Sequence, residues 1–136
     1  MMALITWSDG LSVKVRQFDD QHKKLVEMVN QLHDGMKAGK GSQVLGDILK
    51  SLISYTQTHF AAEEQLMRTH NYPDFEAHKK EHNALVMQVL DLQKQLQGGK
   101  PVLTQNVMNF LRDWLTKHIQ GDDKKYGPFF NGKGVA

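Results

Sequence analysis

Cysteine is absent from the 136 residues of this chain. Its absence excludes disulfide bridges, thiolate metal sites, iron–sulfur clusters and a thiol nucleophile. Long apolar runs are missing as well, since none approaches the roughly 18 residues that a membrane-spanning helix needs. The first ten residues, MMALITWSDG, lack the basic segment and the long apolar stretch of a signal peptide. We therefore expect a soluble, cytoplasmic protein.

A strong charge of one sign is also missing. The formal net charge is +2, and no basic block is longer than a pair of lysines, so the composition does not indicate nucleic acid as a partner. The hydrophobic fraction of 40% and the charged fraction of 24% are ordinary for a globular protein. The length suffices for one domain with one core, and we expect a monomer. Seven histidines are the one unusual count.

Four segments carry the alternating three- and four-residue apolar spacing of amphipathic helices. The first such stripe consists of Phe18, His22, Leu25, Val29, Leu32 and Met36. The stripes predict helices at about 19–37, 43–69, 74–96 and 103–120, with Asp19 or Asp20 capping the first. Gly98-Gly99-Lys100-Pro101 is expected to close the third helix. Short connections between them predict an all-α, up-down-up-down antiparallel four-helix bundle.

The two ends of the chain lack this period. Residues 1–18 contain the turn signal Ser8-Asp9-Gly10 and predict an extended N-terminal arm anchored by Trp7. Gly121 is expected to end or bend the fourth helix. Residues 121–136 predict a short C-terminal tail in which Tyr126, Phe129 and Phe130 fold back as an apolar cap.

The stretch between His59 and His82 holds two pairs of metal-ligand residue types. His59 and Glu63 are four residues apart, and so are His78 and His82. A spacing of four places both side chains on one helix face, about 6 Å apart along the axis. If the chain turns back at the sequence Asn71-Tyr72-Pro73-Asp74, the two pairs face each other inside a helical hairpin.

The remaining helices supply further candidates on their core-facing stripes. The candidates are His22, His59, Glu63, His78, His82 and His118. The antiparallel topology places all of them in one layer. Because a buried polar group without a partner costs about 1–3 kcal/mol, such a layer predicts a bound metal.

A last carboxylate from the end of the fourth helix would complete the set. Asp123 lies five residues after His118, which on an unbroken α-helix directs it roughly 140° away. Gly121 allows a bend that could bring it back. Asp122 lies four residues after His118, on the same face. Spacing alone does not choose between the two aspartates.

Five histidines and two carboxylates exceed what one ion binds. A single zinc site takes about three or four protein ligands. Two octahedral ions bridged by two carboxylates and a solvent-derived oxygen would accommodate all five histidines and leave one position open. Mixed imidazole and carboxylate ligation with an open position suits iron better than magnesium or calcium.

The chain resembles the hemerythrin family from Trp7 through Tyr126. The resemblance rests on His22 within DDQHKKL, on the two spaced pairs of the hairpin, and on WLTKHIQGDDKKY. It implies that Asp123 is the last ligand, and that Glu63 and Asp123 bridge two iron ions in an oxo- or hydroxo-bridged di-iron centre. It further implies His78, His82 and His118 on one iron, and His22 and His59 on the other, open iron.

The same resemblance implies a function. We expect reversible dioxygen binding, for transport, storage or delivery to an oxygen-consuming enzyme, and a binding protein rather than an enzyme. An oxygen or redox sensor, and a di-iron oxidase, peroxidase or nitric oxide reductase, remain alternatives. The family places an apolar residue over the open iron, which makes Leu115, with Trp114, the candidate lining of an oxygen pocket. His33, Glu64 and Glu81 are interpreted as surface residues.

Overall fold

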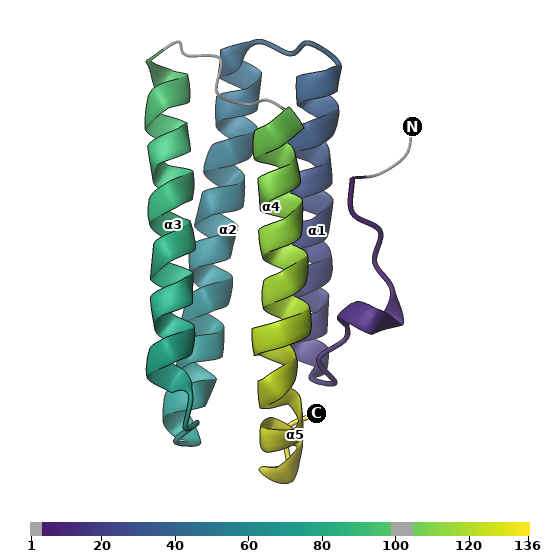
Figure 1. Ribbon diagram of the computed structural model, residues 1–136, viewed down its shortest axis with the longest axis vertical. Helices are drawn as coiled ribbons and strands as arrows, with labels where there is room; N and C mark the ends of the chain where they lie inside the picture. The colour runs from purple at the N-terminus through teal and green to yellow at the C-terminus, as the bar shows by residue number, and fades with distance from the viewer. Residues whose placement is uncertain (1–3, 99–104) are drawn as a thin grey trace.

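The computed structural model describes residues 4–98 and 105–136, and these form a bundle of four long antiparallel helices (Figure 1). The helices are α1 (Arg16–Lys37), α2 (Ser42–Thr69), α3 (Phe75–Gln97) and α4 (Gln105–Lys117). Successive helices run in opposite directions, which confirms the predicted up-down-up-down arrangement. The expected closure of the third helix at Gly99-Lys100-Pro101 and the start of the fourth at 103 lie outside the described residues.

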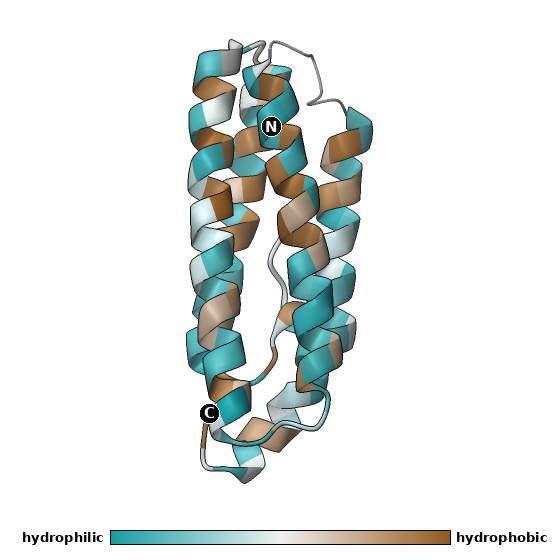
Figure 2. Cartoon of the chain, turned by 90° about the vertical axis from the view of Figure 1, so that its left-hand side faces the viewer, coloured by the Kyte–Doolittle hydropathy of each residue, from teal (hydrophilic) through white to brown (hydrophobic). Residues whose placement is uncertain are grey.

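The core follows the apolar stripes. Phe18, Leu25, Val29 and Leu32 of α1 are buried, as their three- and four-residue spacing predicts. Figure 2 shows how hydrophobic and hydrophilic residues alternate around each helix of the bundle. No helix among the described residues is long and apolar enough to cross a membrane.

His33 is a correction to the sequence interpretation. It lies off the α1 stripe, yet only 4% of it is exposed. Its Nε2 atom lies 3.0 Å from Oε1 of Gln105, at the start of α4. Because α4 packs beside α1, it covers a helix position that the phase of α1 alone places on the surface.

The N-terminal arm differs in detail from the prediction. It includes one turn of 3₁₀-helix, η1 (Asp9–Leu11), and α1 already begins at Arg16, so Asp19 is not a cap. Instead, the Asp19 carboxylate accepts hydrogen bonds from Ser12 Oγ at 2.6 Å and from the Val13 amide at 2.8 Å. These two hydrogen bonds and the buried apolar residues of the arm hold it against the bundle. Trp7, the predicted anchor, is only half-buried.

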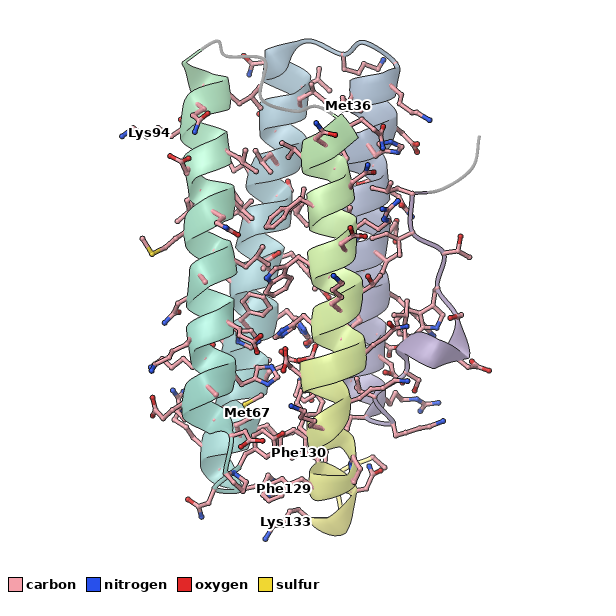
Figure 3. All side chains as sticks on the ribbon, viewed as in Figure 1. Met36, Met67, Lys94, Phe129, Phe130 and Lys133 are labelled. Atoms are coloured by element: carbon pink, nitrogen blue, oxygen red, sulfur yellow. The ribbon has the colours of Figure 1, made fainter. Side chains whose placement is uncertain are left out.

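The C-terminal segment is helical where a tail was predicted. After α4 the chain forms a π-helix, η2 (His118–Asp123), and then α5 (Lys124–Gly132). Tyr126 and Phe130 are four residues apart and both fully buried, so the helical period continues beyond Gly121. Phe129 and Phe130 lie beside the α2–α3 turn (Figure 3), where both rings contact Tyr72.

Candidate metal centre

The structure brings all seven predicted ligand residues into one layer of the bundle interior. α1 contributes His22, α2 contributes His59 and Glu63, α3 contributes His78 and His82, and η2 contributes His118 and Asp123. None of the seven is more than 4% exposed. The layer lies in the half of the bundle that contains the α2–α3 turn.

Two groups of donor atoms form within this layer. One group contains His22, His59, Glu63 and Asp123, and the other contains Glu63, His78, His82, His118 and Asp123. In each group the donor atoms lie within 4.8 Å of one another. The two carboxylates belong to both groups, and the histidines divide into two and three.

Each carboxylate directs one oxygen toward each group. Glu63 Oε2 lies 3.4 Å from His22 Nε2 and 3.5 Å from His59 Nε2, while its Oε1 lies 3.2 Å from His82 Nε2. Asp123 Oδ2 lies 3.1 Å from His22 Nε2. Its Oδ1 lies 2.8 Å from His78 Nε2 and 3.1 Å from His118 Nε2. This division of oxygens is what a carboxylate needs to bridge two cations.

The π-helix explains how Asp123 reaches the layer. In an α-helix a residue five positions after His118 would point away from it. Residues His118–Asp123 adopt the wider π turn, whose hydrogen bonds join residues five apart and whose segments recur at functional sites. The wider turn returns Asp123 to the face of His118. Asp122 remains outside the layer and is part of the protein surface.

The unsatisfied atoms of the layer fit a metal. Among the described residues, Nε2 of His22, His59 and His78, Oε1 of Glu63 and both Asp123 oxygens are buried without a hydrogen-bond partner. Nε2 of His82 and Nε2 of His118 face each other at 3.2 Å. Buried polar atoms nearly always have a hydrogen-bond partner. Cations bound between these nitrogen and oxygen atoms would satisfy their lone pairs.

Polar side chains around the layer orient two of its five imidazole rings. Gln21 Oε1 accepts a hydrogen bond from His59 Nδ1, and Glu64 Oε2 accepts one from His82 Nδ1 at 2.9 Å. With the proton on Nδ1, each Nε2 lone pair faces the interior, as metal-binding histidines require. Glu64 is half-buried and accepts a hydrogen bond from His82, so the interpretation of Glu64 as a surface residue is wrong.

Tyr126 is a further residue whose role the sequence interpretation missed. It was interpreted only as part of an apolar cap, but its buried hydroxyl donates a hydrogen bond to Glu63 Oε2. Burial and the nearby carboxylates raise the pKa of Tyr126 well above its ordinary value, so the phenol keeps its proton. Its spacing of three from Asp123 was the available signal, because a residue three positions on lies on a similar helix face.

The carboxylates dominate the electrostatics of the layer. Burial alone would raise the pKa of Asp123 and of Glu63, but the surrounding imidazoles outweigh burial and lower both. Burial alone would lower the pKa of His22, yet hydrogen bonds and charge from Asp123 and Glu63 raise it to about 10. Burial lowers the pKa of His59 to about 4. The layer is thus organised around two negative charges.

An apolar cavity of about 40 Å³ adjoins the layer. Leu115 and Trp114, the predicted pocket residues, both line it, together with Phe60. The Phe60 ring stacks on His82 at a centroid distance of 3.7 Å, and Trp114 stacks on His118 at 4.5 Å. The aromatic side chains thus connect the cavity to the histidines.

The chain is similar to known proteins over most of its length. The family model described as the Hemerythrin HHE cation binding domain matches residues 13–130. The chain is 44% identical to a bacteriohemerythrin of Methylococcus capsulatus, covering 93% of this chain and 97% of that protein. It is 37% identical to a bacteriohemerythrin of Pseudomonas aeruginosa, covering 92% and 80%. A crystal structure of wild-type hemerythrin matches with a TM-score of 0.86 at 44% identity, covering 93% of this chain and 97% of that chain.

Proposed function

We propose that this chain, which belongs to the hemerythrin family, binds dioxygen reversibly at a non-haem di-iron centre. His78, His82 and His118 would hold one iron, and His22 and His59 the other, with Glu63 and Asp123 bridging the two. The observation that carries the proposal is the division of each carboxylate between the two groups of histidines. When bound, the two ions supply the electrons and the open coordination position that dioxygen needs.

The protein's contribution is to position the ligands and to keep the site dry. The group with two histidines has one protein ligand fewer than the other, so an ion held there would have the open position. Leu115 and Trp114 would line the pocket for dioxygen. Of the residues that line the cavity, Thr56 alone carries a side-chain hydroxyl, and this hydroxyl donates to its own helix at Leu52 O, 2.7 Å away.

The absence of an acid from this lining favours binding over bond cleavage. General acid catalysis requires a proton donor within hydrogen-bond reach of the reacting atom. The lining carries no carboxyl, imidazole or ammonium group. A carrier or reservoir of dioxygen, delivering to an oxygen-consuming enzyme, is therefore the favoured role.

An optical titration tests this proposal. The purified protein is loaded with iron, reduced without air, exposed to dioxygen and then returned to an inert atmosphere. We expect visible absorption bands that appear with dioxygen and vanish when it is removed, over repeated cycles. Bands that persist after the first exposure, or consumption of dioxygen without bands, would contradict a carrier. Turnover with peroxide or nitric oxide would then identify an enzyme.

A further inference from the structure

A groove of about 200 Å³ opens on the surface beside the metal layer, where α3 faces η2. Carboxylates of Asp74, Glu81 and Asp122 line it, against the single ammonium of Lys125. The buried ring of His78 forms part of its lining. The groove is therefore a negatively charged opening that reaches a residue of the inner cluster.

His118 lies between two carboxylates of this groove, Glu81 and Asp122, and the inner cluster. Its Nε2 atom faces inward, 3.1 Å from Asp123 Oδ1. Its Nδ1 atom faces outward, 3.4 Å from Asp122 Oδ2 and 4.0 Å from Glu81 Oε2. His118 is 4% exposed, and its Nδ1 has no hydrogen-bond partner among the residues that the structure describes. The Nε2 atom therefore faces the inner cluster, and the Nδ1 atom faces the carboxylates of Glu81 and Asp122.

We propose that Glu81, Asp122 and Nδ1 of His118 form a loading site, which captures a divalent metal ion from solvent and passes it to the inner centre. The proposal rests on the function proposed above, because it concerns how that centre acquires its metal. The three donors lie within 4.8 Å of one another, close enough for a small ion to draw them together. Two carboxylates and an imidazole suit divalent first-row metals.

The geometry also links the two sites, because His118 belongs to both. Its Nδ1 atom would hold the arriving ion beside Asp122 and Glu81, and its Nε2 atom faces the inner cluster.

The kinetics of ferrous iron uptake test this inference. Metal-free protein is mixed with Fe²⁺ under anaerobic conditions, and a chromogenic ferrous chelator quenches samples over time. Glu81→Gln removes one outer ligand and leaves the seven residues of the inner cluster unchanged. We expect uptake to slow about tenfold, the lower end of what the loss of an outer-shell partner costs a metal site. The final occupancy and the dioxygen-dependent bands of the loaded variant should equal those of the unaltered protein.

Glu76→Gln is the matched control. Glu76 is exposed on the same helix, does not line the groove, and its substitution removes the same charge. We expect it to load at the unaltered rate. If both substitutions slow uptake equally, the effect comes from the overall negative charge of the surface, and the loading site is wrong. An unchanged uptake rate in Glu81→Gln would also overturn it. Neither result affects the di-iron proposal, whereas an unaltered protein that takes up no iron overturns both.

Discussion

At the scale of single residues, the buried layer depends on groups that hold its ligands in place. Glu63 illustrates this dependence. It is fully buried and faces histidines from three helices, while Tyr126 donates to its Oε2. A hydrogen bond to a charged group is worth more than a neutral one, about 1.5–3 kcal/mol. The phenol therefore stabilises the charged form of a carboxylate that has little access to water.

Replacement of Tyr126 by phenylalanine tests this contact. The ring volume is kept and only the donor is lost, so we expect the free energy of unfolding of the metal-free protein to fall by about 2 kcal/mol. Urea denaturation followed by circular dichroism measures the change. Tyr55→Phe is the control, since Tyr55 lines an open surface groove and its substitution should change stability by less than about 0.5 kcal/mol. Equal stabilities for the two variants would show that the Tyr126 hydroxyl contributes nothing.

At the scale of helices, the sequence predicts elements with a clear period and misses those that tertiary contacts create. The stripe of α1 and the layer of histidines followed from three- and four-residue spacing and antiparallel topology. The π-helix did not, because spacing left Asp122 and Asp123 as equal alternatives and only the resemblance to a family favoured Asp123. His33 was misplaced for a similar reason, since its burial depends on α4.

The contact between the N-terminal arm and α5 is another feature that tertiary packing creates. A Cβ atom added at Gly127 would lie 2.4 Å from the carbonyl oxygen of Val13, a distance that no ordinary contact allows. The backbone of the arm therefore approaches α5 more closely than any residue with a side chain permits. Periodicity within either segment gives no signal of this contact, because it joins residues at opposite ends of the chain.

Gly127→Ala tests how tightly the arm is held. In a helix interior alanine is normally favoured over glycine by about 1 kcal/mol. At Gly127 the clash should reverse this sign and lower the free energy of unfolding by about 1–3 kcal/mol, as overpacking does. Gly46→Ala in α2 meets no atom within 4 Å and should stabilise the protein. Denaturant titration of both variants measures the difference in the free energy of unfolding. If Gly127→Ala is neutral or stabilising, the arm can move away from α5 without loss of stability.

At the scale of the whole molecule, the metal layer makes the bundle respond to pH. The ring of His22 faces the carboxylates of Glu63 and Asp123 and the imidazole of His59. Both carboxylates have lowered pKa values, so they stay charged in neutral and alkaline solution. The pKa of His22 is about 10 in the folded protein, against about 6.5 in the unfolded chain. A raised histidine pKa contributes stability that is complete below pH 6.5 and is lost as the pH rises toward 10.

The stability of the metal-free protein should therefore fall between pH 7 and pH 10, by a few kcal/mol at most. His118, whose pKa is also raised by Asp123 and the other carboxylates, acts in the same direction. Urea denaturation across this range measures the slope, and His22→Gln should flatten it.

Bound metal occupies Nε2 in place of the proton, so the loaded protein should lack the slope. Loading in weak buffer at pH 7 should release protons. A slope that is equal in the metal-free, loaded and His22→Gln proteins would assign the pH response to groups outside the layer.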